Sequence, residues 1–242
     1  MDGMWDSGLI PMATHYEIKI DDERIGFFAI NEEGALVQFF ILPEFEGQGA
    51  DTFRQVVAEH KVTTAIVATI DPQFLSLCLD CQGGLSVHTL LYGTNPAIQP
   101  EKEPLSGPTF TAATIDELDA IIAFQVMCLG GNKNLVGWLT GYSSNLIERK
   151  ELFVLRHEDA WLGLGEMRKS DTQPGIADVG MMVSPEHRGQ GLGTDILLRL
   201  RELCAASGLN AICSTTLENA PSQIAIKRAG FTGHHRILEI NL

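Results

Sequence analysis

The sequence predicts an α/β protein with a mixed sheet, repeated in two related domains. Strand-like and helix-like segments alternate along the chain. The segment 93–108 holds four prolines and two glycines, which neither a helix nor a central strand accommodates. The string Pro43–Gly49 returns as Pro185–Gly191 at an offset of 142 residues. We therefore expect a first domain at 1–92, a linker at 93–108 and a second domain at 109–242.

The second domain is expected to begin with two helices. Thr114 caps the first, which Gly130 and Gly131 end after about Leu129, and the second covers about Asn134 to Ile147. Short apolar runs then predict strands, and 3.6-residue periodicity predicts helices. The expected order is strands Glu151–Arg156, Trp161–Met167 and Ala177–Val183, a helix through Ile196 to Cys204, strand Ala211–Thr216, helix Ser222–Ala229 and strand His235–Ile240.

The first domain repeats this order without the two opening helices. The same patterns predict strands Tyr16–Asp21, Glu23–Ile30 and Leu36–Leu42, helix Thr52–His60, strand Thr64–Thr69, helix Pro72–Gln82 and strand Ser86–Tyr92. The shared order and the shared string indicate two tandem copies of one fold.

Composition excludes several functional classes. The 242 residues hold 17 Lys and Arg against 31 Asp and Glu, a net charge of −14. Residues 1–100 hold 4 basic against 14 acidic residues. Nucleic-acid phosphates and anionic lipids attract basic surfaces, so neither is an expected partner. The acidic field mildly favours a cationic partner, or it serves only to keep the protein soluble.

The cysteines and the N-terminus indicate the compartment. Five cysteines in apolar surroundings are typical of reduced core thiols, and the lone pair Cys78 and Cys81 favours packing over zinc. The N-terminal residues from Met1 are acidic without an apolar leader, and no apolar run reaches the roughly 20 residues of a membrane span. We expect a cytoplasmic protein without a metal.

The stretch Val183–Thr194 has the chemistry of a phosphate site. Gly189, Gly191 and Gly193 alternate in a turn between a strand and a helix. Such a turn exposes successive backbone N–H groups, and the helix N-terminus adds about half a positive charge. Arg188 adds a full charge. The spacing differs from that of the Walker A loop and of the dinucleotide fingerprint.

These residues resemble the acetyl-CoA signature of the GNAT superfamily of N-acetyltransferases. The match consists of Val183, Pro185, Arg188, Gly189, Gly191 and Gly193 in their spacing. The segment Asn219–Phe231 resembles the family's late Asn-containing helix, which ends in Gly-Phe. The resemblance covers about 109–242. It implies tandem GNAT-like folds, each with a mixed, mostly antiparallel twisted sheet flanked by helices.

The resemblance also implies which residues bind acetyl-CoA. The strand before the loop splays from its neighbour and pairs with the pantetheine arm, while the loop amides bind the diphosphate. Asn219 and Ser222 are expected either to contact the cofactor or only to cap their helix. The implied cofactor-binding set is Met181, Met182, Val183, Arg188, Gly189, Gln190, Gly191, Leu192, Gly193, Thr194, Asn219 and Ser222.

The implied reaction is direct attack of a primary amine on the thioester in a ternary complex. Asp178 is the first candidate for the catalytic base, since it takes the place of the Glu of many relatives, and Glu166 is the second. Either carboxylate could instead be an exposed strand-end group. Ile226 replaces the Tyr that often protonates the leaving thiolate, which leaves that role open among Ser214, Thr215, Thr216 and His234.

The first copy departs from the signature. Glu46 takes the place of Arg188, and Asp51 takes the place of Gly193. Because carboxylates repel a diphosphate, we expect the first copy not to bind CoA and instead to pack against the second copy or to wall the substrate pocket.

Three functional hypotheses fit the sequence. The leading hypothesis is an acetyl-CoA-dependent N-acetyltransferase acting on a small-molecule or peptide amine, as a monomeric pseudo-dimer of domains or a homodimer. A catalytically weak CoA-binding sensor or assembly module would explain Ile226 and the absence of Glu at 178. A domain that binds another phosphate ligand is the third.

Overall fold

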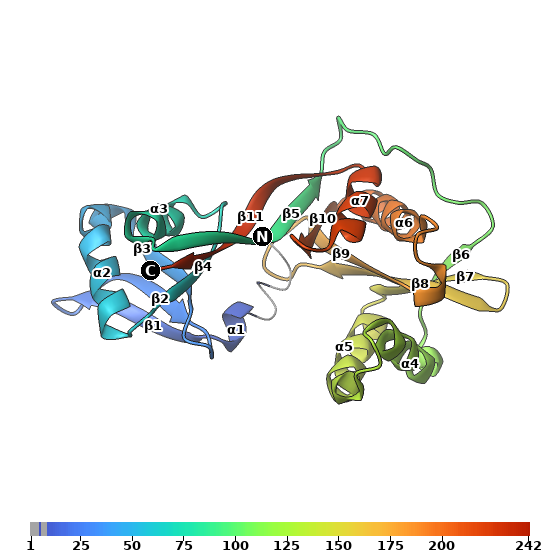
Figure 1. Cartoon of the computed structure of the whole chain (residues 1–242), viewed down its shortest axis with the longest axis horizontal. Coiled ribbons are helices and arrows are strands. Elements are labelled where there is room, and N and C mark those ends of the chain that lie inside the picture. Colours follow the sequence, from blue (N-terminus) through green and yellow to red (C-terminus); the bar gives the residue numbers. More distant parts are fainter. Residues whose placement is uncertain (1–4, 6–8) are drawn as a thin grey trace. The chain divides into compact units, whose positions relative to one another are not determined.

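The computed structural model describes Trp5 and residues 9–242, and the chain forms two compact units (Figure 1). The first unit comprises 1–91, 214–218 and 233–242, and the second comprises 92–213 and 219–232. Each unit therefore includes residues that are distant in sequence. The N-terminal residues on which the expectation about a leader depends lie largely outside the described residues.

The first unit is a sheet whose two longer helices pack on one face, while Ile10 packs against Ala29 and Val37 on the other face. Its sheet order is β1-β2-β3-β4-β11-β5, and the final strand of the chain, β11, pairs antiparallel with β4 through Ile237–Asn241. The elements are α1 (Ile10–Met12), β1 (Thr14–Ile20), β2 (Glu23–Ile30), β3 (Leu36–Ile41), the 3-10 helix η2 (Pro43–Gln48), α2 (Gly49–Glu59), β4 (Thr64–Ala68), α3 (Pro72–Cys81), β5 (Gly84–Thr94) and β11 (Phe231–Asn241).

The second unit has helices on both faces of its sheet. The sheet order is β10-β9-β8-β7-β6, antiparallel except for the β9–β10 pair. The elements are β6 (Thr109–Ala112), η3 (Ile115–Glu117), α4 (Leu118–Cys128), η4 (Lys133–Leu135), α5 (Val136–Glu148), β7 (Leu152–His157), β8 (Ala160–Lys169), β9 (Ile176–Val183), η5 (Pro185–His187), α6 (Leu192–Ala206), β10 (Asn210–Thr216) and α7 (Ala220–Arg228).

The predicted mixed α/β fold is confirmed, and each predicted helix and strand is present within a few residues of its expected ends. Strand β6 is an addition that the sequence did not reveal, since it lies in the short stretch between the Pro-rich segment and Thr114. Pairing with β7 along its whole length defines it as a strand. The partner of the last strand also required the tertiary structure, because strand pairing depends on long-range contacts.

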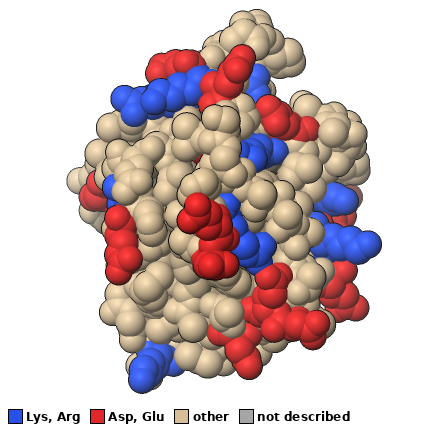
Figure 2. Space-filling view, turned by 90° about the vertical axis from the view of Figure 1, so that its right-hand side faces the viewer, with Lys and Arg blue, Asp and Glu red and all other residues tan. Residues whose placement is uncertain are grey.

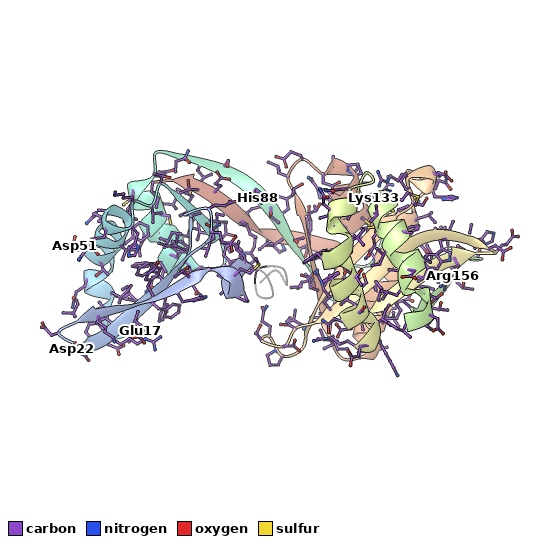
Figure 3. All side chains as sticks on the ribbon, turned by 90° about the horizontal axis from the view of Figure 1, so that it is seen from below. Glu17, Asp22, Asp51, His88, Lys133 and Arg156 are labelled. Atoms are coloured by element: carbon purple, nitrogen blue, oxygen red, sulfur yellow. The ribbon has the colours of Figure 1, made fainter. Side chains whose placement is uncertain are left out.

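Helices α4 and α5 cover one face of the second unit's sheet (Figure 3), and α6 covers the other. A Cβ atom at Gly163 or Gly165 would lie under 3 Å from side-chain carbons of Ile196 on α6. The two glycines therefore allow α6 to lie close against β8.

Aromatic rings from different strands fill corresponding positions on the sheets of the two units. The offset of 142 and the strand registers make Phe28 the counterpart of Gly165, and Tyr16 the counterpart of Phe153. In the second unit the ring of Phe110, from β6, covers Gly165 and stacks on Phe153 at 5.2 Å. In the first unit the ring of Phe28 itself stacks on Tyr16 at 4.6 Å. The first unit thus supplies from β2 the ring that β6 supplies in the second.

The polar surface and the cysteines agree with the composition. On the face shown in Figure 2, Lys and Arg lie interspersed with Asp and Glu and form no continuous basic surface. All five cysteines are free of disulfides. Burial raises the pKa of the Cys78 thiol to about 12 and that of Cys204 to about 11, so both stay protonated at neutral pH. None of the described helices is long and apolar enough to cross a bilayer.

Candidate active site

Strands β9 and β10 run parallel for only three residue pairs and then part. The last pair is Asp178 with Ile212, whereas β9 continues to Val183 and stays paired with β8 on its other side. From Val179 to Val183 the edge of β9 that faces β10 has no strand partner among the described residues. Backbone N–H and C=O groups on such an edge can pair with an extended ligand.

Side chains alternate along this open part of β9. Met181 points toward α6, since a Cβ atom at Gly193 would lie 3.3 Å from its Sδ and Cε atoms. Met182 points to the opposite face and packs against the core cluster beneath α4 and α5. Val183, the last residue of β9, is partly exposed. The three predicted residues therefore share one backbone edge while their side chains divide between both faces.

The loop after β9 has the backbone shape of an anion site. Gly189 and Gly191 adopt left-handed conformations with φ of 78° and 86°, and no atom lies within 4 Å of a Cβ built at either glycine. The first N–H of α6 with a backbone acceptor is that of Asp195, which donates to Gly191 O at 3.1 Å. The preceding amides of α6, from Leu192 to Thr194, have no backbone acceptor among the described residues and form the helix N-terminus.

The other loop residues divide into exposed and buried ones. Gln190 is exposed beside the two glycines, whereas the side chains of Leu192 and Thr194 are buried at 5% exposure each. Leu192 and Thr194 therefore offer no exposed side chain to a ligand.

Arg188 is exposed and anchors the loop. Its guanidinium donates to Cys128 O at 3.1 Å, at the end of α4, and more weakly to Val183 O at 3.4 Å. The charge predicted from sequence is therefore located beside the loop, and the side chain also ties α4 to β9.

Asn219 caps helix α7. Its side-chain oxygen accepts from Ser222 N–H at 3.3 Å, which is the capping alternative raised from the sequence. Ser222 is partly exposed in the first turn of the helix. Ile226 is buried at 3% exposure, so α7 presents no acid at that position.

The two candidate bases have different environments. Asp178 is 4% exposed and lies directly opposite Arg168, whose Nη2 approaches its Oδ1 at 3.1 Å. Glu166 lies opposite Gly180 and is partly exposed. A Cβ atom at Gly180 would lie 2.4 Å from Glu166 Oε1, so the glycine leaves room for this carboxylate to lie over β9.

Tyr142 and Arg168 connect the two carboxylates. The Tyr142 hydroxyl, from α5, donates to Glu166 Oε2 at 2.5 Å and accepts from Arg168 Nη1 at 3.1 Å. Burial, followed by the nearby Glu166 charge, raises the pKa of Tyr142 well above its usual range, so the hydroxyl remains a donor. Trp138 stacks on Tyr142 at 4.8 Å and is 56% exposed.

Tyr142, Trp138 and Arg168 were not among the site residues expected from the sequence. A weak signal existed, because Trp138 and Tyr142 are four residues apart and share a face of the predicted helix. The contact of Tyr142 with Glu166 and Arg168 on β8 required the packing of α5 on the sheet. Among the described residues, no group of His, Cys, Asp and Glu has the arrangement of a metal site.

Comparison with known proteins defines the class as an acetyltransferase with two GNAT domains. A model of the acetyltransferase (GNAT) domain matches residues 1–95, and a model of the acetyltransferase (GNAT) family matches 123–231. A GNAT-family acetyltransferase from Colwellia psychrerythraea is 34% identical over 100% of this chain and 90% of its own, with a TM-score of 0.92. The chain belongs to the GNAT acetyltransferase family, and the predicted tandem arrangement is confirmed.

More distant structures share the fold. A GCN5-related N-acetyltransferase from Sphaerobacter thermophilus has a TM-score of 0.67 at 15% identity, over 90% of this chain and 77% of its own. A tandem GNAT protein from the clavulanic acid biosynthesis pathway has a TM-score of 0.66 at 16% identity, over 98% and 85%. The search of curated proteins finds no match.

Proposed function

We propose that the second unit transfers an acetyl group from acetyl-CoA to a primary amine, by direct attack within a ternary complex. The observation that supports this most directly is the sequence of features along β9. An edge without a strand partner leads into a left-handed glycine turn, which leads into the N-terminus of α6. Acetyl-CoA supplies the activated thioester.

The loop would hold the diphosphate through its main chain. The open space above Gly189 and Gly191 lets an anion reach the backbone amides, and the helix dipole and the Arg188 charge favour it. The free edge of Met181 to Val183 would pair with the amide groups of the pantetheine arm. Asn219 would act as a helix cap, and Ser222 would lie beside the arm.

Glu166 is the better candidate for the base that takes a proton from the attacking ammonium. It is partly exposed over Gly180, and Tyr142 fixes its orientation. Asp178 is buried against Arg168 and has a structural role in this proposal. Proton transfer by a positioned carboxylate increases the reaction rate by about 10²–10⁴-fold. Holding the amine beside the thioester contributes most of the remaining rate acceleration.

The first unit would not bind the cofactor, and its own packing supports this. Strands β3 and β4 also part after one residue pair, but the Gln73 side chain pairs with the backbone of Ile41 there, accepting from its N–H at 2.8 Å and donating to its C=O at 3.0 Å. Ile41 is the counterpart of Val183, so a side-chain amide occupies the backbone groups that a pantetheine amide would use.

Further differences also disfavour cofactor binding by the first unit. Aligning the helix caps Asp71 and Asn219 makes Phe74 the counterpart of Ser222, and Phe74 is 1% exposed. The loop before α2 forms the 3-10 helix η2, and neither of its glycines is left-handed. Glu46 and Asp51 also make this segment negatively charged. It therefore lacks both the backbone shape and the charge of an anion site.

A direct experiment tests the proposal. The full chain is incubated with acetyl-CoA and a panel of primary amines, CoA release is followed with a thiol reagent, and the product mass is measured. Glu166→Gln is the matched variant, expected to bind CoA in calorimetry and to lose turnover. Binding of CoA without turnover on any amine would favour the sensor alternative. Binding of nucleotides but not of CoA would favour another phosphate ligand and contradict the proposal.

A further inference from the structure

Strand β1 is a free edge in the first unit. It stands first in the sheet order, and its only strand partner among the described residues is β2. The corresponding edge of the second unit, on β7, is covered along four residue pairs by β6. The first unit has no such cover in the part of the chain that the structure describes, so β1 presents a backbone edge without a strand partner along Thr14–Ile20.

The edge is regular enough to accept another strand. The register of the β1–β2 pair shifts between Ile18 and Lys19, but the extra residue is Ile25 on β2, which is fully buried. Strand β1 itself is therefore continuous. A β-bulge on the exposed strand would have protected it against pairing, and this bulge lies on the inner strand.

The side chains of β1 complement a second copy of the same strand. In an antiparallel pair centred on Ile18, Glu17 would face Lys19 of the partner subunit, and Lys19 would face Glu17 of the partner subunit. Tyr16 would face Ile20 of the partner subunit in the same way. A two-fold axis makes each contact occur twice, which is the condition for a closed dimer.

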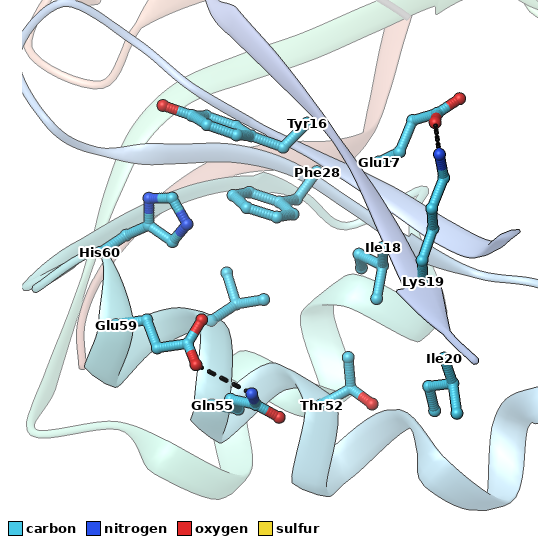
Figure 4. A pocket seen from close by; sticks show the side chains of 11 residues that line it. Tyr16, Glu17, Ile18, Lys19, Ile20, Phe28, Thr52, Gln55, Glu59 and His60 are labelled. Carbon is cyan, nitrogen blue, oxygen red and sulfur yellow. Dashed lines mark hydrogen bonds and ion pairs between the residues drawn. The ribbon is translucent and has the colours of Figure 1, made fainter. Parts of the chain in front are cut away.

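Exposure agrees with this pairing. Glu17 and Lys19 lie on one side of β1 and join in an ion pair of 2.9 Å, with side chains about half exposed (Figure 4). Ile20 is 41% exposed at the strand end. Tyr16 and Ile20 also border a cavity of about 250 Å³ between β1 and α2, which includes His60 and Glu59. Pairing would cover Tyr16 and Ile20 at the rim of this cavity.

We propose that β1 forms an antiparallel interface with β1 of a second copy of this chain. Opposite charges across strands stabilise a pair, and like charges directly opposite destabilise it. The other sheet edge, β6, has four residues and no charged side chain. A pair of β6 strands would therefore lack a charge match that selects a second copy of this chain. A strand from a different protein could pair with the same backbone edge, but it would lack the charge match that occurs twice in the symmetric pair. Binding of such a strand is the alternative that the test below distinguishes.

Charge exchange tests the interface. Glu17→Lys and Lys19→Glu are each expected to turn two attractive contacts into repulsive ones and to raise the dissociation constant of the dimer about tenfold or more. The double variant restores both pairs with their signs reversed and should dimerise like the wild type. Mixing the two single variants should produce a heterodimer, because one chain then presents lysine at both positions and the other presents glutamate at both.

Sedimentation velocity across a concentration series measures each case, and thermal unfolding of the same samples confirms that each variant folds. A wild type that stays monomeric at all concentrations overturns the proposal and leaves the edge for a foreign strand. A dimer that both single variants retain unchanged also overturns it, because the interface then lies elsewhere. CoA binding by the second unit is an independent readout that these variants should not change.

Discussion

The hydroxyl of Tyr142 donates to the carboxylate of Glu166 at 2.5 Å, which joins helix α5 to strand β8 at the point where β9 leaves β10. The contact orients a partly exposed carboxylate, while the neighbouring Asp178 is held by Arg168. The sequence made Asp178 the first candidate for the base and Glu166 the second, and the proposed reaction reverses that order.

Replacing Glu166 by Gln should lower kcat by about 10²–10⁴-fold, because the positioned proton acceptor is lost while the shape of the side chain is kept. The affinity for CoA should not change, since Glu166 lies opposite Gly180, three residues before the end of β9 and thus before the glycine loop. Steady-state kinetics with the best amine from the panel and calorimetry with CoA measure the two quantities. A variant with wild-type kcat would remove Glu166 from the mechanism.

Replacing Asp178 by Asn should act mainly on stability. The Arg168 side chain, only 18% exposed, would lose a carboxylate partner, and breaking such a pair costs about 3–5 kcal/mol. Urea unfolding measures this loss, and kcat of the folded variant should fall less than in Glu166→Gln. Unchanged stability with a lost kcat would instead identify Asp178 as the base.

Tyr142 should make the stability of the protein depend on alkaline pH. Its pKa is raised in the folded state, first by burial and then by the Glu166 charge, so the folded protein holds the phenol proton more tightly than the unfolded chain. The resulting contribution is fully present below about pH 10, the ordinary Tyr pKa, and declines as pH rises above it.

The matched variant for this effect is Tyr142→Phe. Urea unfolding as a function of pH should show a shallower decline above about pH 10 in the variant than in the wild type. The same variant should lower kcat more than it changes the KM for acetyl-CoA, since it loosens the carboxylate and leaves the loop intact. Parallel alkaline declines in the two proteins would contradict the assignment.

Replacing Arg188 by Glu, the residue that the first unit has at this place, should weaken CoA binding at least about tenfold. The variant loses both a charge beside the diphosphate and the hydrogen bonds to Cys128 O and Val183 O. Arg188→Lys separates these effects, because it keeps the charge and loses the fork geometry. Unchanged affinity in Arg188→Glu, measured by calorimetry, would exclude Arg188 from the site.

Gly189 and Gly47 form a matched pair at the same place in the two loops. Gly189 has a φ of 78°, and Gly47 is not left-handed, although both have open space around a built Cβ. Gly189→Ala should cost about 1–2 kcal/mol of stability and weaken CoA binding, since the added methyl group strains the turn and lies where the anion would approach.

Gly47→Ala should leave CoA binding unchanged and should not reduce stability. Thermal unfolding and calorimetry compare the two variants. Equal losses of CoA affinity would mean that the first unit takes part in binding.

The sequence by itself determined the local elements and the tandem repeat. Hydrophobic periodicity and the prolines of 93–108 depend on neighbouring residues, so they could be read without the fold. The glycines of the second loop also had a local signature, because left-handed backbone and close ligand approach require them.

Only the tertiary structure decided how those elements combine. Strand β11 pairs with β4, although the two strands are far apart in the sequence, and no local pattern encodes that choice. The same holds for the hydrogen bond of Tyr142 to Glu166 and for that between Gln73 and Ile41. Each of these contacts depends on a helix that packs against a strand distant in sequence. The distinction between Glu166 and Asp178 follows from burial and partners, which arise only when the chain has folded.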